Sequence, residues 1–222
     1  MTDSIQRQDN LATAQRWWRL KYVLEWMVAF GGVLVILPLL VLIALIVKVT
    51  SAGPVLYVSP RLGRNGRVFS LYKFRSMRVN VPQLTAPDGK VITLKNDSRL
   101  TPIGTFLRLG FDELPQLFNV LKGDMTLIGP RPDVPSEWGR YTEREGGRLK
   151  VLTGITGLTQ VVGGREMNNA QNYELDVRYV ERAGLGTDLL ILLLTLPYSL
   201  GGKNMGKRFL KSFLVGIEDL GK

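Results

Sequence analysis

A long apolar segment near the N-terminus constrains this chain more than any other feature. From Val23 to Val47 there are 25 residues, and Glu25 is the only charge among them. About 20 apolar residues in a helix are enough to cross the hydrocarbon core of a bilayer. The apolar part of a secretory signal is only about 7–15 residues long, so the segment predicts a membrane helix rather than a signal peptide.

Pro38 and the flanking charges leave the path of this helix open. A proline inside a helix removes one backbone hydrogen bond and clashes with the carbonyl four residues earlier, so a kink or break is expected after Leu34. Positive charge marks the cytoplasmic side of a membrane segment. Basic residues lie on both flanks, namely Arg16, Arg19 and Lys21 before the segment and Lys48, Arg61, Arg64, Arg67, Lys73, Arg75 and Arg78 after it. The residues alone support a kinked span and a re-entrant helix equally.

The composition excludes several kinds of catalysis. The chain of 222 residues has no cysteine and no histidine, which excludes disulfides, thiolate nucleophiles, imidazole acid–base chemistry and metals bound by Cys or His. Catalysis would have to use carboxylates, amines, guanidinium groups, hydroxyls or an oxygen-bound cation such as Mg²⁺. Lys and Arg outnumber Asp and Glu by 29 to 19, a formal net charge of +10. This excess indicates an anionic partner, which could be a membrane surface, nucleotide phosphates or nucleic acid.

The rest of the chain predicts an α-rich α+β fold. Two β-prone segments flank Asn65-Gly66, a strong signal for a hairpin turn. Strands are expected at 55–58 and 68–74, helices at 103–109, 114–121, 136–144, 169–182 and 187–196, and loops or turns at 80–100, 129–132 and 154–157. The helix at 187–196 is too short to span a membrane, and it is expected to be a core helix or an interfacial one.

Three parts are therefore expected along the chain. Residues 1–50 form a basic N-terminus and the membrane helix, residues 51–200 form a catalytic domain, and residues 201–222 form a basic tail. The tail mixes Lys203, Lys207, Arg208 and Lys211 with Phe209, Leu210 and Phe213. This pattern suits an acidic lipid surface and suits a solvated basic tail equally well.

Asp112 and Glu113 are the strongest candidates for chemistry. They begin the helix predicted up to Leu121, with Asp112 at the N-cap, and capping alone would explain such a pair. The alternative is an ionised carboxylate that shares Mg²⁺ with its neighbour or attacks a phosphate. Phosphoryl transfer also needs cations around a charged diphosphate, and the nearby cations are Lys73, Arg75, Arg78, Arg108 and Arg131. Nucleic acid is not expected as the partner, because it would not require a membrane segment.

Four segments carry a resemblance to a known family. They are LYKFRSM at 71–77, FDELPQLFNVLKGDMTLIGPRP at 111–132, LTGITGLTQ at 152–160 and DVRYVER at 176–182. With these segments, in this order, the chain resembles the bacterial sugar transferases, which are monotopic phosphoglycosyl transferases, over about residues 20–200. Without the long multi-span N-terminal region of larger members, it resembles the minimal catalytic form and is expected to work without that region.

The resemblance implies a reaction and a place in the cell. It implies transfer of a sugar-1-phosphate from a UDP-sugar to polyprenyl phosphate, with release of UMP, as the first membrane step of glycan assembly. The expected location is the cytoplasmic face of the inner membrane, and the expected partners include membrane lipids. A homodimer is allowed, and the sugar is not specified.

The resemblance also implies roles for single residues. Asp112 would attack the β-phosphate and carry the phosphosugar in a ping-pong route, while Mg²⁺ neutralises the diphosphate. Asp112 and Glu113 would be the metal ligands, and Glu113 could instead activate the acceptor. The other implied roles are Arg131 at the nucleotide, Lys73, Arg75 and Arg108 at phosphate or at the carboxylates, and Pro38 at the break of a re-entrant helix.

Two departures from the family pattern concern Phe111 and Arg165. Phe111 replaces the Ser or Thr-Leu type of residue that often precedes the Asp-Glu pair in the family, and this change is expected to be neutral. Gly163-Gly164-Arg165 replaces the family's Asn-Gly-Arg at expected contacts to the sugar or nucleotide, and Arg165 remains a substrate-binding candidate.

Two alternatives to the covalent transferase remain. One is a membrane-anchored adaptor that recruits anionic partners through its basic face, which would leave the segment from Asp112 to Pro132 unexplained. The other is a transferase in which the acceptor attacks the donor directly.

Overall fold

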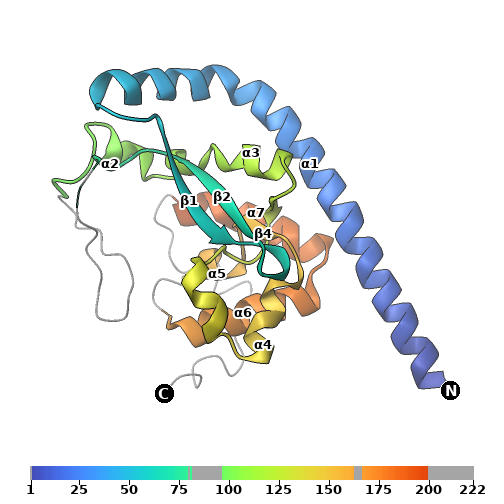
Figure 1. Ribbon diagram of the computed structural model, residues 1–222. Helices are drawn as coiled ribbons and strands as arrows, with labels where there is room; N and C mark the ends of the chain where they lie inside the picture. Colours follow the sequence, from blue (N-terminus) through green and yellow to red (C-terminus); the bar gives the residue numbers. More distant parts are fainter. Residues whose placement is uncertain (1, 80, 82–96, 163–166, 200–222) are drawn as a thin grey trace.

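The computed structural model of the protein describes residues 2–79, 81, 97–162 and 167–199 (Figure 1). This part of the chain is rich in helix, with two small sheets, so the prediction of a helix-rich fold with a small sheet is confirmed. The elements are α1 (Thr2–Thr50), β1 (Leu56–Leu62), β2 (Val68–Phe74), α2 (Gly104–Leu107), α3 (Gln116–Leu121), β3 (Met125–Ile128), α4 (Glu143–Gly146), β4 (Thr153–Thr156), α5 (Leu158–Val161), α6 (Asn169–Arg182) and α7 (Leu185–Ser199). Short 3₁₀ turns lie at Arg64–Gly66, Phe111–Glu113, Pro135–Arg140 and Gly147–Lys150.

The apolar segment is part of one long helix. Helical structure continues through Pro38 from Thr2 to Thr50, and Figure 1 shows that this helix bends and passes over the rest of the molecule. A proline inside a helix is the usual cause of such a bend. The helix is therefore bent rather than broken into two helices. The described part of the helix from Arg16 to Thr50 is long and apolar enough to cross a membrane.

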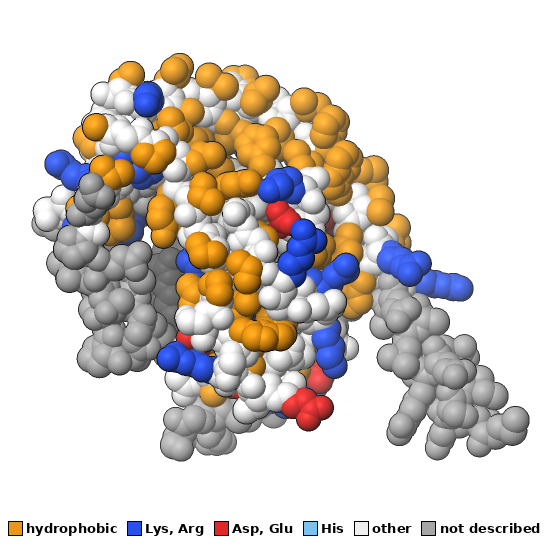
Figure 2. Space-filling model, in the orientation of Figure 1, with side chains coloured by type: hydrophobic (Ala, Val, Ile, Leu, Met, Phe, Trp, Pro, Cys, Tyr) orange, Lys and Arg blue, Asp and Glu red, His pale blue; other side chains and the backbone are white. Residues whose placement is uncertain are grey.

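One face of α1 packs against the globular part on both sides of Pro38. Before the proline, Ala29 packs in a cluster with Leu71 and Met125. After it, Leu40 and Val47 join a second cluster that includes Phe74 and Leu107. The opposite face exposes large apolar side chains, namely Val23, Leu24, Met27, Val28, Leu34, Val35, Leu37, Val41, Leu42 and Leu45. Figure 2 shows many orange side chains, with white atoms between them, along the length of this helix.

Lys21 and Glu25 lie on the buried face of α1. The Lys21 ammonium contacts the Glu25 carboxylate and lies 2.7 Å from Asp188 in α7. Glu25 also accepts a hydrogen bond from the Leu127 amide in β3, at 2.7 Å. Charged groups inside a protein need partners of this kind. Lys21 is therefore buried and paired with carboxylates inside the protein, unlike the exposed Arg16 and Arg19 that precede it.

The predicted hairpin is present and positions one side of the site. β1 pairs antiparallel with β2 from Leu56–Phe74 to Leu62–Val68, so β1 is longer than predicted. Asn65 and Gly66 form the turn with positive φ values of 58° and 75°, which Asn and Gly tolerate best. Residues directly opposite each other share a face of the hairpin.

The segment predicted as a loop at 154–157 is mostly a strand. β4 pairs in parallel with β3, and neither strand was predicted. The glycines that suggested a loop allow two backbones to approach, because a Cβ on Gly154 or Gly157 would overlap the backbone of Gly129. Gly129 donates a hydrogen bond to the Thr156 carbonyl at 2.9 Å. The segments GPRP and GITG are therefore held side by side.

The single helix predicted at 136–144 was also wrong. A 3₁₀ turn ends at Arg140, Tyr141 is extended, and a new capping box from Thr142 to Glu145 begins α4. The helix predicted at 169–182 is confirmed as α6.

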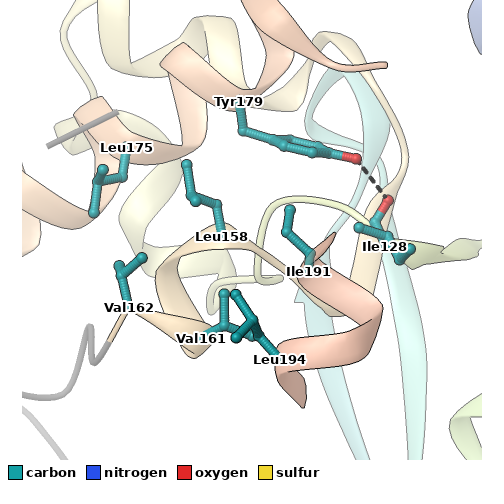
Figure 3. Packing of buried hydrophobic residues seen from close by; sticks show 8 residues of the cluster. All are labelled: Ile128, Leu158, Val161, Val162, Leu175, Tyr179, Ile191 and Leu194. Carbon is teal, nitrogen blue, oxygen red and sulfur yellow. Dashed lines mark hydrogen bonds between the residues drawn. The ribbon is translucent and has the colours of Figure 1, made fainter. Parts of the chain in front are cut away.

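A compact hydrophobic cluster holds the C-terminal helices on β3 (Figure 3). Its members are Ile128, Leu158, Val161, Val162, Leu175, Tyr179, Ile191 and Leu194. The Tyr179 hydroxyl donates a hydrogen bond to the Ile128 carbonyl at 3.2 Å. In α7, Ile191 and Leu194 are buried while Leu192 and Leu193 are exposed, so this helix packs in the core on one face and leaves the other face uncovered.

Candidate active site

Asp112 and Glu113 lie in a short turn rather than at the start of a helix. Gly110 has a φ of 116°, a left-handed conformation that favours glycine, and the 3₁₀ turn Phe111–Glu113 follows it. Pro115 occupies the N-cap of α3. The expectation that Asp112 caps this helix was therefore wrong. The two carboxylates are presented by a turn that precedes the helix.

This turn is anchored to the second half of α1. The ring of Phe111 stacks on the ring of Phe106 with centroids 4.5 Å apart. Phe111 and Leu114 both pack against the cluster that contains Leu40 and Val47. Phe111 therefore has a packing role. Because it packs against this cluster, the candidate carboxylates that follow it lie beside the apolar helix.

Lys73 connects the hairpin to both carboxylates. Its ammonium lies 2.5 Å from a Glu113 carboxylate oxygen and 4.0 Å from an Asp112 oxygen. Burial raises the pKa of Asp112 above its usual range, and Glu113 adds to the shift, whereas Lys73 and Arg108 oppose it. Glu113 thus has a close cationic partner, while Asp112 is left with a weaker one in a desolvated position.

A small pocket brings Lys73 and Glu113 together with residues from distant parts of the chain. Its volume is about 40 Å³, which has room for a few waters or a phosphate group but not for a nucleotide sugar. A larger substrate would extend across the open side. The lining residues are Arg61, Leu71, Lys73, Glu113, Gln116, Arg131, Pro132, Gly154, Ile155 and Gln160.

A buried ion network supports the turn that carries Arg131. Arg148 is almost completely buried and donates to the Arg131 carbonyl at 2.6 Å. The same guanidinium donates two hydrogen bonds to Asp176, at 2.6 and 3.0 Å, and also contacts Asp133. The contacts of Arg148 therefore fix the backbone of the turn that precedes Asp133. The Arg131 side chain lines the pocket.

The structure brings some of the predicted residues together and places others elsewhere. Lys73, Glu113 and Arg131 line the pocket, and the charge of Arg108 acts on Asp112. Arg75 does not line the pocket, because its buried guanidinium donates to the carbonyls of Ser51, at 2.6 Å, and of Ala52. It connects β2 to the segment that follows α1. Arg165 lies outside the described residues.

Arg61, Gln116 and Gln160 are the pocket residues with charged or amide side chains that the sequence analysis did not assign. The sequence analysis treated Arg61 only as one of the positive charges that follow the apolar segment. The hairpin register could have indicated it, because Arg61 is four residues from Tyr57, the partner of Lys73, and alternate residues of a strand share a face. Gln160 ends the LTGITGLTQ segment, but only the pairing of β3 with β4 brings it toward Arg131.

Asp112 and Glu113 are the nearest candidates for holding a metal ion. No group of three or more acidic side chains suited to a metal is found among the described residues. Mg²⁺ does not need one, because it is often held by one or two carboxylates together with substrate phosphates. The donor set fits an ion that binds with a substrate.

The sequence model of the bacterial sugar transferases matches residues 16–202, most of the chain. The chain belongs to this family. A galactosyl transferase, CpsE, from Streptococcus agalactiae is 42% identical over 164 residues, which cover 68% of this chain and 36% of the relative. An undecaprenyl-phosphate galactose phosphotransferase from Salmonella typhimurium is 44% identical over 161 residues, 67% of this chain and 34% of the relative.

This bacterial sugar transferase covers different shares of the lengths of its relatives. The chain spans about a third of the two relatives above. It spans 76% of the exopolysaccharide production protein ExoY from Rhizobium meliloti, with 36% identity over 173 residues and 72% of this chain covered. The matched part includes the turn with Asp112 and Glu113 as well as the pocket, since both lie within residues 16–202.

Proposed function

We propose that this protein transfers a sugar-1-phosphate from a UDP-sugar to polyprenyl phosphate and releases UMP. The observation that carries the proposal is the position of Asp112 and Glu113, which lie in a turn packed against the apolar helix α1 and face the Lys73 ammonium. Glu113, Lys73 and Arg131 line the pocket beside this turn. One substrate is soluble and charged, and the other has a headgroup at the bilayer surface. A site that is both cationic and adjacent to a membrane helix suits this pair of substrates. One of the relatives is named an undecaprenyl-phosphate galactose phosphotransferase, and its name agrees with this reaction.

The proposed chemistry has two steps at one carboxylate. An Asp112 oxygen attacks the phosphorus that carries the sugar, and the bond from that phosphorus to the oxygen of UMP breaks as UMP leaves. The phosphosugar is then bound to Asp112 as an acyl phosphate. An oxygen of polyprenyl phosphate attacks the same phosphorus and releases the Asp112 carboxylate. Lys73 stabilises the negative charge that develops on the phosphoryl oxygens.

Mg²⁺ is part of the proposal, with Asp112 and Glu113 as its ligands from the protein. When bound, the ion would neutralise the diphosphate of the donor. The Lys73 ammonium lies close to Glu113 and near Asp112, so these two carboxylates favour a cation at this position. Glu113 is the residue whose contact with Lys73 would have to adjust when the ion binds.

We propose that α1 enters and leaves the membrane by the cytoplasmic face. Residues on both sides of Pro38, such as Ala29 and Val47, pack against the same globular part. A straight span would carry one of these two halves away from it. The exposed apolar face of α1 would then contact lipid while the opposite face holds the domain at the surface.

The absence of cysteine provides a direct test of this topology. Two single-cysteine variants, Arg16→Cys and Ser51→Cys, place one thiol near each end of the apolar segment in a background without other thiols. Both should react with a membrane-impermeant maleimide from the cytoplasmic side only. Labelling of the two positions from opposite sides would establish a span and overturn the re-entrant path.

The reaction is tested by the intact mass of the purified protein after incubation with UDP-sugars and Mg²⁺ in the absence of lipid. The wild type should gain the mass of one phosphosugar, and Asp112→Asn should gain nothing. Asp124→Asn is a matched control, because Asp124 lies beyond the far end of α3 and pairs with Lys122. This control should form the adduct normally.

The other outcomes separate the alternatives. Release of UMP only when polyprenyl phosphate is present, without any adduct, would keep the transferase and exclude the covalent intermediate. An adaptor would tolerate Asp112→Asn in binding its partners and would show no turnover with any UDP-sugar.

A further inference from the structure

Gln116 and Asn119 are two buried amides of α3 that differ in how they are paired. Asn119 is fully buried and uses both polar groups of its side chain. Its oxygen accepts a hydrogen bond from the Tyr72 amide at 3.0 Å, and its nitrogen donates to the Ser70 carbonyl at 2.7 Å. Gln116 is only 3% exposed, yet its side chain has no hydrogen-bond partner in the part of the chain that the structure describes. Gln116 is therefore a buried amide that is left without its hydrogen bonds.

The unpaired amide of Gln116 belongs to the pocket beside the candidate carboxylates. Gln116 lines this pocket together with Lys73, Glu113 and Arg131. A buried amide costs free energy unless a ligand or water supplies its hydrogen bonds. The pocket has room for a phosphate group, and two of its lining residues are cations, so an anionic ligand is favoured there. Gln116 is thus placed to donate to an anionic oxygen.

The backbone places Gln116 on the same side of the chain as Asp112 and Glu113. A 3₁₀ turn ends at Glu113, and Leu114 and Pro115 keep right-handed helical φ and ψ angles up to the start of α3. The helical path is therefore continuous from the carboxylates to Gln116. Residues three or four positions apart on such a path are neighbours on one face. A group bound to Asp112 would consequently lie within the neighbourhood of the Gln116 amide.

The position of Gln116 is set before any substrate binds. The hydrogen bonds of Asn119 hold α3 against β2, which is the strand that carries Lys73. Gln116 lies one turn earlier on the same helix. Lys73 is already engaged by Glu113 at 2.5 Å, whereas the Gln116 amide has no partner to give up. A donor that is fixed in place and uncommitted can stabilise charge in a reaction with little reorganisation.

We propose that the Gln116 amide donates a hydrogen bond to a non-bridging oxygen of the phosphoryl group that is transferred to and from Asp112. This inference rests on the proposed function, and it makes Gln116 a catalytic residue beside Lys73. In the first step the bond from phosphorus to Asp112 forms and the bond to UMP breaks. In the second step an acceptor oxygen replaces Asp112. The amide keeps its protons throughout, and it assists both steps because the same phosphoryl oxygens are present in each.

The test compares Gln116→Leu with Asn119→Leu, which both replace a buried amide of α3 by an apolar side chain of similar size. Gln116→Leu should slow formation of the phosphosugar adduct at saturating UDP-sugar by about 10- to 100-fold, the loss typical of a hydrogen bond to a charged group. Single-turnover mass spectrometry of the full-length protein measures this rate. The melting temperature of Gln116→Leu should stay the same or rise, because no protein group loses a partner. Asn119→Leu should lower it, since the Tyr72 amide and the Ser70 carbonyl are left unpaired.

Three further measurements identify the group that Gln116 contacts. Discharge of the adduct by polyprenyl phosphate should slow by a similar factor, and the KM for the UDP-sugar should change less than the rate. The factor should be the same for two UDP-sugars that the wild type accepts. Gln116→Glu, which has nearly the same size, brings a negative charge to the phosphoryl group and should react more slowly than Gln116→Leu.

Four results would overturn this inference. Adduct formation or discharge at the wild-type rate in Gln116→Leu would show that the amide does not assist the transfer. A loss confined to one UDP-sugar would assign the amide to a sugar hydroxyl. A reaction in Gln116→Glu as fast as in Gln116→Leu would exclude a donor to an anionic oxygen. A melting temperature lowered as much as in Asn119→Leu would make Gln116 a structural residue.

The same variants separate this inference from the proposed function. Adduct formation at equal rates in the wild type and Gln116→Leu would keep the proposed reaction and reject the role of Gln116. Turnover without an adduct would reject the covalent intermediate, and slower UMP release in Gln116→Leu would then still support the contact with the phosphoryl group.

Discussion

Two clusters of charge in this protein differ in how completely they are paired. Arg148 and Asp176 each expose only 2% of the side chain, and the guanidinium is shared among Asp176, Asp133 and the Arg131 carbonyl. In the pocket, Lys73 is 22% exposed and lies 2.5 Å from Glu113 but 4.0 Å from Asp112. In the Arg148 cluster the guanidinium is buried and fully paired. In the pocket the charged groups are more exposed and are paired unequally.

The difference separates a structural role from a chemical one. A buried charge is tolerated when its partners are complete, and removing one partner is then expensive. A carboxylate that must attack a phosphate needs the opposite arrangement, with burial, a nearby cation and an uncommitted oxygen. The Arg148 network fixes the turn that carries Arg131, whereas the charged side chains that line the pocket remain available to a ligand.

The largest effect is expected from Arg148→Met. This change leaves Asp176 and Asp133 without their common partner, and it should lower the free energy of unfolding by about 3–5 kcal/mol. Chemical denaturation of the purified protein measures the loss. A decrease below about 1 kcal/mol would mean that the network is not the closed structural unit described above.

Lys73→Met should affect activity more than stability. Lys73 stabilises phosphoryl charge in the proposed reaction, so its loss should reduce the rate of adduct formation by about 10- to 100-fold. The partly exposed ion pair with Glu113 should contribute less than about 1 kcal/mol to the free energy of unfolding. Single-turnover mass spectrometry and thermal unfolding measure the two quantities. A large loss of stability with normal adduct formation would make Lys73 a structural residue.

The pH dependence of adduct formation should reflect Asp112. Burial raises the pKa of this carboxyl, and only the ionised form attacks, so the rate should fall with decreasing pH at a higher pH than for an ordinary Asp. Because Lys73 opposes this shift, the acid limb should move to still higher pH in Lys73→Met. Rates measured across the acid range in the two proteins test the prediction, and identical limbs would contradict it.

The same shift predicts the sign of a change in stability. A pKa that is higher in the folded than in the unfolded protein means that ionising Asp112 disfavours the fold. The wild type should therefore lose stability relative to Asp112→Asn as the pH rises from the ordinary Asp value through the raised pKa.

The smallest effect is expected from Arg144→Ala. Arg144 joins α4 to Glu174 and Glu181 of α6 at the surface, and 54% of its side chain is exposed. Exposed pairs contribute up to about 1 kcal/mol because water and salt screen them. Unfolding at low and high salt should show a small loss that decreases with salt, and adduct formation should not change. A loss comparable to that of Arg148→Met would remove the distinction between exposed and closed networks.

Much of the fold follows from local signals in the sequence. Asn65-Gly66 predicts the hairpin turn because few other residues adopt its positive φ angles. The helix expected at 169–182 is α6, and the apolar segment predicts the long helix. The parallel strands β3 and β4 were not predicted, because their glycines favour a loop when the partner backbone is unknown.

The candidate site was predicted in part for a similar reason. Asp112, Glu113, Lys73 and Arg131 come from segments that resemble the family, and the structure places them around one pocket or beside it. Arg75 has the same residue type as Arg61, but only the packing shows that Arg75 binds the chain after α1 while Arg61 faces the pocket.

Residue types and their order were enough to identify the family, the long apolar helix and the kind of chemistry that the chain can support. These depend on residue type and on spacing along the chain, which hold before any folding occurs. The tertiary structure decided which charges are neutralised. Lys21 and Arg148 find carboxylates from distant helices, and Arg61 and Arg131 find none among the described residues. The physical reason is that electrostatic energy depends on distance and burial in three dimensions, and neither quantity is set by position in the sequence.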